Sequence, residues 1–409
     1  MKTAGIIAEY NPFHLGHSYH IEETRRLTGA DYIIIIMSGN FTQRGRAAIM
    51  DKYSRAEYAL KHGADLVLEL PVCFAASSAR YFAFGAVSLL SRLGVVDYLS
   101  FGSESGNLEI IQKISAFLEK EPVAYRDTLC GKLKEGFSYP GARAYALQKH
   151  FPQMDQDFLS HPNNILGIEY CNALLSFNSP IKPVTLKRLH SSYHDTALSP
   201  DGFSSATSIR QTLREGISDT LAEHLPACVY QSVTKEYGLS LPISTNDFSS
   251  LLHYRLLSGS FKEYALYADV HEDLARRIEN QLFSFTDFEA FCDLLKTKEL
   301  THSRISRALL HILLGIKQEE LKKYKEEGYC RYGRILGLRR DAGPLLSQIK
   351  AHTCLPLISK LADARPLLDS LSLQMLETDI RSSHIYESVL SRKFSAPFRN
   401  EYSRQFPVL

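Results

Sequence analysis

Short apolar runs alternate with amphipathic segments along the first hundred residues of this chain. Apolar runs of strand length occupy residues 4–8, 32–37, 65–70 and 98–101. Between them, apolar residues recur at helical spacing over residues 15–27, 52–62 and 78–93. Alternation at these short intervals is typical of βαβ units, and it predicts an α/β fold with a parallel, Rossmann-like sheet. Ligands of such open sheets bind beyond the carboxyl ends of the strands.

The pattern changes near residue 215, after which helical segments predominate. Apolar residues at helical spacing predict helices over 251–257, 272–283, 285–298, 303–314 and 355–376. A chain of 409 residues also exceeds the size at which a single hydrophobic core usually suffices. We therefore expect two domains, an α/β domain over residues 1–215 and a mainly helical domain over residues 216–409.

The first apolar strand leads directly into the sequence Asn-Pro-Phe-His-Leu-Gly-His, residues 11–17. This order predicts a strand, a tight turn and a helix start, whose unpaired N–H groups and partial positive charge suit phosphate. His14 and His17 lie one helical turn apart, so both imidazoles can direct N–H donors at one phosphoryl group. Gly16, which lacks a Cβ, would let a flat base approach the backbone. The alternative is an ordinary strand-to-helix turn that carries two surface histidines.

A second possible phosphate site lies near residue 205. A fifth strand, predicted over residues 183–190, carries Arg188 near its end, and a later helix begins with Ser and Thr residues. Hydroxyl and free N–H groups at a helix start can hold phosphate, which makes Ser205 and Thr207 candidate ligands. Helix capping alone would explain the serines but not Arg210. Two such motifs, each where a strand gives way to a helix, are more specific together than either alone.

Two further segments lie where ligands of the predicted sheet would bind, and a third candidate, Asn163, lies in a polar break at residues 160–164 of a mostly helical region. The polar loop Ser-Gly-Asn-Phe-Thr-Gln-Arg-Gly, residues 38–45, follows the second strand, and Gly102 follows the fourth. Gly102 is either a position where adenine or ribose rests on the strand end or an ordinary strand-terminating glycine. Asn163 is either a helix cap or a side chain that reads a nucleotide, since one amide offers both donors and an acceptor.

Basic and aromatic residues cluster twice in the helical half. Arg304 and Arg307 share one face of a predicted helix, and Arg331 and Arg334 lie in a tyrosine-containing stretch without acids. Such clusters suit RNA, because they supply phosphate contacts and stacking surfaces. The alternative for each cluster is a solvated surface.

Composition adds a few limits. A hydrophobic content of 44% and a charged content of 22% are ordinary for a globular protein, and a net charge of +2 does not itself indicate a polyanionic partner. The N-terminus lacks the apolar run of a signal peptide and no segment approaches membrane-spanning length, so we expect a cytoplasmic protein. Seven scattered cysteines without a Cys-x-x-Cys pair favour neither a zinc site nor a disulfide framework, and no metal ligands are predicted.

Residues 11–17 resemble the HIGH signature of the nucleotidyltransferase superfamily. In that superfamily, the two histidines stabilise charge while a nucleophile attacks the α-phosphate of ATP, which implies catalytic roles for His14 and His17. Residues 205–210 resemble an adenylyltransferase motif that grips the triphosphate, with Ala206 in place of the middle hydroxyl. Together with segments 38–45, 63–71 and 101–104, the pattern resembles the tRNA(Met) cytidine acetate ligase family of bacteria over most of the chain.

That resemblance implies an ATP-dependent ligase. Acetate would attack the α-phosphate of ATP to give acetyl-adenylate and pyrophosphate. The exocyclic amine of the wobble cytidine in elongator tRNA(Met) would then take the acetyl group and release AMP. Mg²⁺ is expected with ATP, held mainly by phosphates and water, and no obligatory protein partner is indicated. By position, the nucleotide contacts would be Ile7, Ala8, Asn11, Pro12, Phe13, His14, Gly16, His17, His20, Gly102, Asn163 and Arg188.

Two other functions fit parts of the sequence. A metabolic adenylyltransferase could join AMP to a small molecule, but such enzymes can manage without a helical half of about 190 residues. A non-catalytic RNA-binding protein with a relic nucleotide fold would not need His14, His17 and the motif at residues 205–210.

Overall fold

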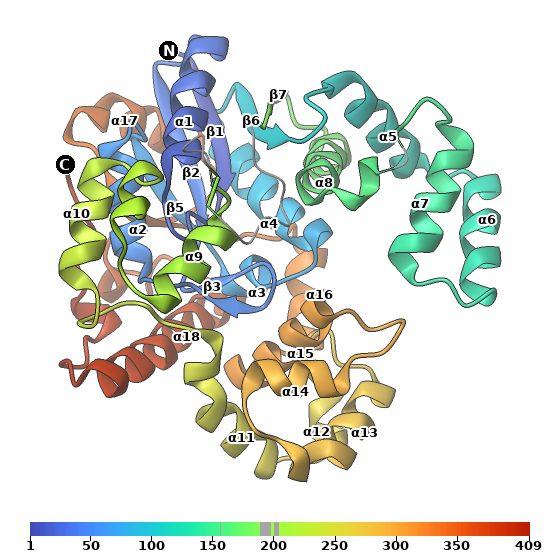
Figure 1. Ribbon diagram of the computed structural model, residues 1–409. Coiled ribbons are helices and arrows are strands. Elements are labelled where there is room, and N and C mark those ends of the chain that lie inside the picture. The colour runs from blue at the N-terminus through green and yellow to red at the C-terminus, as the bar shows by residue number, and fades with distance from the viewer. Residues whose placement is uncertain (156, 189–197, 200–203) are drawn as a thin grey trace.

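The computed structural model describes residues 1–155, 157–188, 198–199 and 204–409. Its strands are β1 (Thr3–Ala8), β2 (Tyr32–Ser38), β3 (Phe41–Thr42), β4 (Arg46–Ala47), β5 (Leu66–Leu70), β6 (Tyr98–Ser103), β7 (Lys182–Lys187), β8 (Gly333–Leu338) and β9 (Leu357–Ile358). Seven of them form one sheet in the order β7–β6–β1–β2–β5–β8–β9, and β3 pairs with β4 in a separate hairpin (Figure 1). Within the sheet, β5 and β8 are antiparallel and the other neighbours are parallel.

Helices cover both faces of this sheet (Figure 1). The α-helices are α1 (Leu15–Thr28), α2 (Lys52–Lys61), α3 (Val72–Ala75), α4 (Ala79–Arg92), α5 (Leu108–Lys120), α6 (Val123–Lys134), α7 (Tyr139–His150), α8 (Pro162–Ser176), α9 (Ala206–Glu215), α10 (Ala227–Glu236), α11 (Ser249–Leu257), α12 (Phe261–Tyr264), α13 (Glu272–Gln281), α14 (Phe288–Leu295), α15 (His302–Leu314), α16 (Gln318–Glu326), α17 (Gly343–His352) and α18 (Ser370–Phe394). The predicted α/β fold with a largely parallel sheet is confirmed. The end of the strand predicted over 183–190 lies partly outside the described residues.

The central strand β2 shows why the sequence folds this way. Its run Tyr-Ile-Ile-Ile-Ile-Met-Ser is buried on both faces, as expected for a parallel strand between two helical layers. Ile33 and Ile35 join a core with α1, α2 and α10, whereas Ile34 and Ile36 join a larger core with α3, α4 and α8. Alternate residues of one strand therefore hold two helical layers.

The C-terminal half returns to the sheet, which differs from the predicted division at residue 215. Strand β8 pairs with β5, and β9 extends the sheet beyond β8. The larger core also continues from the sheet into α11, α13, α14, α15 and α18. The helix predicted over 355–376 is wrong, because this stretch contains β9 and irregular backbone before α18 begins at Ser370.

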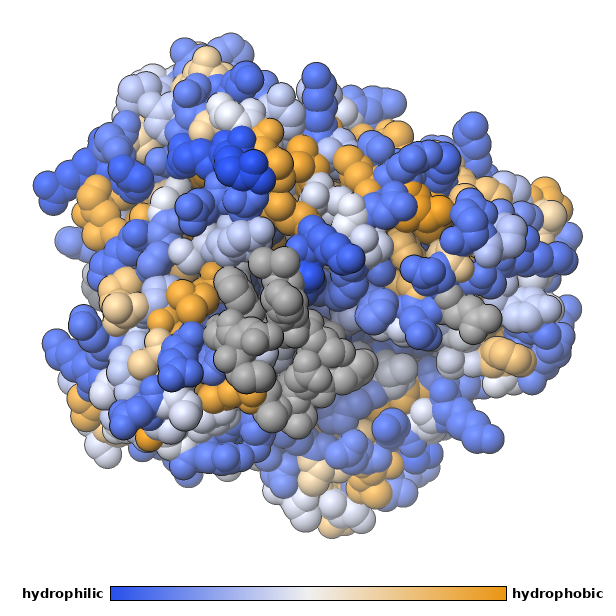
Figure 2. All heavy atoms as spheres, turned by 45° about the horizontal axis from the view of Figure 1, so that its top comes forward, coloured by the Kyte–Doolittle hydropathy of each residue, from blue (hydrophilic) through white to orange (hydrophobic). Residues whose placement is uncertain are grey.

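The surface is mixed in character. Figure 2 shows mostly hydrophilic residues on one face, with hydrophobic residues in small separate groups among them. No helix among the described residues is both long and apolar enough to cross a membrane.

Candidate active site

A cavity of about 650 Å³ lies at the carboxyl ends of β1, β6 and β7, within the usual size range of small-molecule sites. We call it the central cavity. All but two of the predicted nucleotide contacts line it, namely Ile7, Ala8, Asn11, His14, Gly16, His17, His20, Gly102, Asn163, Arg188, Ser205 and Thr207. The exceptions are Pro12 and Phe13. The Phe13 ring is fully buried with its centroid 5.6 Å from that of His17, so it supports the histidine motif from behind.

The two histidines of the motif lie at the start of α1, where their side chains cap the helix and are held in place by the capping hydrogen bonds. The Gly16 N–H donates to Nδ1 of His14 at 3.1 Å, and the His14 N–H donates to Nδ1 of His17 at 3.3 Å. This reciprocal capping makes both Nδ1 atoms acceptors, so each neutral ring carries its proton on Nε2. The ring centroids are 3.7 Å apart and stacked. The motif therefore presents two parallel imidazoles, each with one N–H donor.

The electrostatic surroundings keep these imidazoles uncharged. Burial and the charges of Arg188 and Arg210 lower the pKa of His14 to about 3, and burial with the neighbouring His14 lowers the pKa of His17 well below its usual value. Burial and Arg188 lower the pKa of His20 to about 4, and its Nε2 lies 3.1 Å from the Ser100 hydroxyl. At neutral pH all three rings act as neutral hydrogen-bonding groups, and the positive charge of the site comes from arginine and lysine side chains.

Gly16 has a second role besides the predicted one. A Cβ at this position would lie 2.9 Å from Cε1 of His14, closer than real contacts allow, so the glycine makes room for the capping imidazole. It also lines the central cavity, where room for a base stays a prediction.

The second predicted phosphate motif lies against the first. Ser205 caps α9, because its hydroxyl accepts the Ser208 N–H at 3.1 Å. Arg210, one turn into the helix, donates to the Asn11 carbonyl at 2.6 Å and to the Thr207 hydroxyl at 3.1 Å. Arg210 therefore joins the α9 start to the histidine motif. The structure brings both motifs to one cavity, as the sequence predicted.

Gly102 and Asn163 also line the central cavity, as does Arg188. A Cβ on Gly102 would meet the Arg188 side chain at 3.5 Å from its Cγ and the Leu186 carbonyl oxygen at 4.0 Å, both ordinary contacts. The alternative in which Asn163 caps its helix is wrong: the N–H groups of Asn163 and Asn164 at the start of α8 both donate to the Glu104 carboxylate, which is the capping group. The side-chain amide of Asn163 also donates to Glu104, at 2.7 Å.

Several charged residues of the central cavity were not singled out individually from the sequence. Among the described lining residues they are Arg44, Arg46, Lys187, Arg214 and Glu9. The loop at 38–45 pointed towards Arg44, and the four-residue spacing from Arg210 along α9 could have identified Arg214. Basic side chains thus outnumber acidic ones around the central cavity.

Two of the arginines predicted to contact RNA in the helical half, Arg307 and Arg331, contact acidic partners. Arg331 contacts the Asp369 carboxylate at 2.5 Å, and Nε of Arg307 lies 3.2 Å from Asp269 with the arginine side chain only 12% exposed. Arg304 lies partly buried on the same helix as Arg307. RNA contacts by these three arginines stay predictions.

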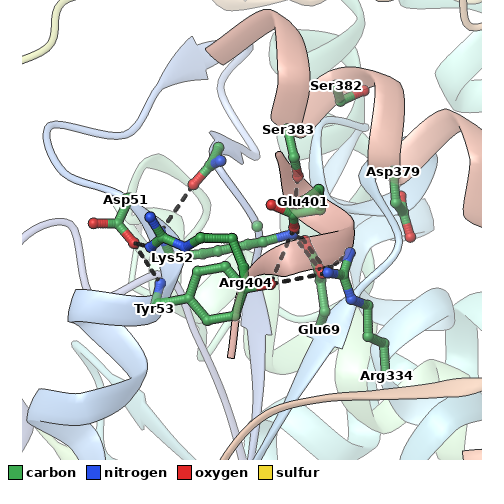
Figure 3. Close-up of polar contacts among 12 residues, drawn as sticks. Asp51, Lys52, Tyr53, Glu69, Arg334, Asp379, Ser382, Ser383, Glu401 and Arg404 are labelled. Carbon is green, nitrogen blue, oxygen red and sulfur yellow. Dashed lines mark hydrogen bonds and ion pairs between the residues drawn. The ribbon is translucent and has the colours of Figure 1, made fainter. Parts of the chain in front are cut away.

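The prediction for Arg334 is wrong, because this arginine is buried in a closed set of charges (Figure 3). Its guanidinium contacts Glu69 at 3.2 Å and Glu401 at 2.8 Å. Buried Lys52 contacts the same two carboxylates at 2.8 and 2.6 Å, and its Nζ also donates to the Ser383 hydroxyl at 2.9 Å. We call Lys52, Glu69, Arg334 and Glu401 the Lys52 cluster. Two cations balance two carboxylates there, so an external phosphate has neither access nor unbalanced charge to meet.

Comparison with known proteins places the chain in a family. The HIGH Nucleotidyl Transferase family model matches residues 1–401. The chain is 37% identical to the tRNA(Met) cytidine acetate ligase of Acetivibrio thermocellus, with 94% of each chain covered, and 37% identical to that of Halothermothrix orenii, covering 100% of this chain and 99% of the relative.

Solved structures agree with these relatives. Thermotoga maritima TmcAL in its apo form is similar over 100% of both chains, with 32% sequence identity and a TM-score of 0.94. The same protein bound with alpha-thio ATP is similar over 100% of both chains, with a TM-score of 0.91. The chain therefore belongs to the HIGH nucleotidyltransferases and, within them, to the tRNA(Met) cytidine acetate ligase family.

Proposed function

We propose that the central cavity activates acetate with ATP and that the protein transfers the acetyl group to the wobble cytidine of elongator tRNA(Met). A carboxylate oxygen of acetate attacks the α-phosphorus of ATP, the bond to the bridging oxygen of the β-phosphate breaks, and pyrophosphate leaves. The cytidine N4 amine then attacks the acetyl carbonyl, loses a proton and displaces AMP. The products are acetylated tRNA, AMP and pyrophosphate.

The observation that carries this proposal is the pair of neutral imidazoles whose capping bonds fix their protons on Nε2. Negative charge grows on the α-phosphate oxygens and the bridging oxygen as acetate attacks, and preoriented N–H donors stabilise such charge without reorganising. A neutral N–H donor forms no ion pair with the phosphates of bound ATP. Its hydrogen bond therefore strengthens most when negative charge grows in the transition state. His14 and His17 are the residues assigned this role.

The remaining cavity residues are assigned to binding. Arg188 and Arg210 would neutralise the triphosphate, together with the N–H groups at the start of α9 and the hydroxyls of Ser205 and Thr207. Gly102 would leave room for the ribose or adenine.

The donor set does not fit a metal centre held by the protein. Among the described residues that line the central cavity, Glu9 is the only carboxylate, and its Oε1 accepts the Gln43 N–H at 2.8 Å. The described part of the chain also contains no group of three or more His, Cys, Asp or Glu residues arranged for a metal ion. Mg²⁺ would enter as the counter-ion of ATP, coordinated by phosphates and water.

Incubation with ATP, labelled acetate and total tRNA tests the proposal. We expect label in tRNA, released as N4-acetylcytidine on digestion, and one AMP for each acetyl group transferred. Release of pyrophosphate without labelled RNA would instead identify an adenylyltransferase of small molecules. Binding of tRNA with neither product would identify a non-catalytic RNA-binding protein.

A further inference from the structure

A second cavity, of about 540 Å³, lies beside the central cavity and shares Arg44 and Arg46 with it. The β3–β4 hairpin, which carries these two arginines, therefore forms the wall between the cavities. We call the second cavity the basic pocket. Its other lining residues are Lys296, Thr297, Lys298, Thr301, His302 and Ser303.

The side chains that line the basic pocket are all basic or hydrogen-bonding. Each of its described residues carries a cation, an imidazole or a hydroxyl group, and none carries a carboxylate. Lys296 and Lys298 are exposed, and neither forms an ion pair within the described part of the chain. The carboxylate nearest to His302 is Asp293, at 3.9 Å. Lys, Arg, Ser and Thr are the side chains that proteins use on nucleic-acid phosphates.

The backbone adds to this positive character. Helix α15 begins in the pocket with Thr301 as its N-cap, without a side-chain capping bond and without an acid in its first turn. The first N–H groups of a helix carry partial positive charge, so this end favours an anion beside the lysines.

The two cavities are held in a fixed relation. The Ser306 hydroxyl on α15 donates to the Gly45 carbonyl in the hairpin turn at 2.8 Å. Gly45 has a φ of +73°, and a Cβ there would lie 2.4 Å from the Arg307 nitrogen, so hairpin and helix pack backbone against backbone. An RNA strand that enters the central cavity thus meets the basic pocket at a set position.

We propose that the basic pocket binds the sugar-phosphate backbone of the substrate RNA beside the nucleotide that enters the central cavity. This inference rests on the proposed function, which requires a cytidine of a large polyanion to reach the central cavity. Among its described lining residues, the pocket has no Phe, Tyr or Trp side chain on which a base could stack. It therefore positions the strand through phosphate contacts and does not read sequence.

The variant Lys296→Ala/Lys298→Ala tests the pocket, because neither lysine lines the central cavity. The matched control is Lys350→Ala/Lys360→Ala, which removes the same charge from exposed positions outside both cavities. We expect the pocket variant to bind tRNA about tenfold more weakly or worse, and its slope of log affinity against log salt to fall by about 1.5 to 2, since fewer counter-ions are released. Acetate-dependent exchange of pyrophosphate into ATP should stay at the wild-type rate.

The alternatives have distinct outcomes. Equal tRNA affinity and salt slope in the pocket and control variants would overturn the inference. Weaker inhibition of the pocket variant by pyrophosphate, with unchanged tRNA affinity, would also overturn the inference. The basic pocket would then bind the pyrophosphate product instead of RNA. If the wild type binds tRNA without acetylating it, the proposed function fails, while a selective loss of affinity in the pocket variant still supports the pocket. Absence of any tRNA binding would overturn both.

Discussion

The central cavity and the Lys52 cluster both bring charged side chains together at the same sheet, but they differ in what balances the charge and in how far it is buried. Around the cavity, basic residues face a single carboxylate, that of Glu9, among the described lining residues. In the Lys52 cluster, two cations and two carboxylates meet at 2.6 to 3.2 Å and leave no net charge. The first region needs an anion from outside, and the second is complete.

Arginine serves two purposes in these regions, half-buried beside the central cavity and fully buried in the Lys52 cluster. Arg188 and Arg210 line a space large enough for a nucleotide, whereas Arg334 fills its space and is only 4% exposed. Residue type alone cannot distinguish them. Loss of charge should therefore affect ligand binding and rate in the cavity but folding stability in the cluster.

The largest expected effect is on stability. Glu401→Gln removes one carboxylate of the Lys52 cluster and leaves buried Lys52 and Arg334 with only Glu69, which should lower the free energy of unfolding by about 3 kcal/mol or more. Urea unfolding at pH 7 measures this change. Pyrophosphate exchange, measured well below the melting temperature, should stay close to wild type.

The pH dependence of the stability loss in Glu401→Gln tests its ionic origin. Burial opposes ionisation of Glu401, but the charges of Lys52 and Arg334 outweigh it and lower the pKa of Glu401 below its usual range. The folded state therefore gains stability above the unfolded pKa near 4.3 and loses it as the pH falls further. The deficit of Glu401→Gln should accordingly shrink in acid. A deficit independent of pH would remove the ionic explanation.

The next largest effect concerns the histidines. His14→Ala and His17→Ala should each lower the rate of acetyl-adenylate formation by roughly a hundredfold or more, because each removes a donor that meets charge in the transition state. ATP affinity, measured by calorimetry, should fall much less. Equal losses of rate and affinity would mean that the histidines bind ATP without stabilising the transition state.

A variant that preserves the helix cap provides the control for this prediction. Since His14 also caps α1, His14→Ala changes the helix start as well as the cavity. His14→Asn keeps a side-chain acceptor for the cap and an amide donor. It should restore the melting temperature and part of the rate. Full restoration of stability with no recovery of rate would indicate that the donor geometry of imidazole is essential.

A smaller effect is expected for Arg188. Arg188→Ala should weaken ATP binding by at least tenfold, in line with about 1.5 to 3 kcal/mol for a hydrogen bond to a charged group. Because Arg188 also lowers the pKa of His20, the pKa of that ring should rise in the variant, which NMR titration can follow. Unchanged ATP affinity by calorimetry would assign Arg188 to the surface charge of the protein.

Local patterns predicted much of this molecule, whereas long-range pairing did not follow from them. Each apolar run, the histidine motif at residues 11–17 and the motif at residues 205–210 is a continuous stretch of sequence. The strands and the two motifs that line the central cavity could therefore be predicted. Arg334 was misassigned because its partner Glu401 lies 67 residues further on, and β8 was missed because it opens with Gly and this charged residue. The role of Gly16 depends on a ring orientation that only the fold defines.

A weaker effect is expected for the arginines of α15. Arg304→Ala/Arg307→Ala should reduce tRNA affinity only a few fold, less than Lys296→Ala/Lys298→Ala, because Asp269 already balances Arg307. Binding measured at several salt concentrations compares the two variants directly. A larger loss from the α15 arginines would move the main RNA contact away from the basic pocket.

A further pH-dependent effect concerns Asp379, which lies beside the Lys52 cluster (Figure 3). Burial and the charge of Glu69 raise the pKa of Asp379 to about 7, so the folded state binds this proton more tightly than the unfolded state. Stability from this group is present at pH 4 and is lost as the pH rises towards 7. Relative to wild type, Asp379→Asn should gain stability across that window. A constant difference in urea unfolding would contradict the shift.

The roles of His17 and of the Lys52 cluster are tested most directly by acetate-dependent exchange of pyrophosphate into ATP without tRNA, compared in the wild type, His17→Ala and Glu401→Gln. We expect exchange that requires acetate, is lost in His17→Ala and persists in folded Glu401→Gln. Exchange that does not depend on acetate, or that is lost equally in both variants, would contradict these roles.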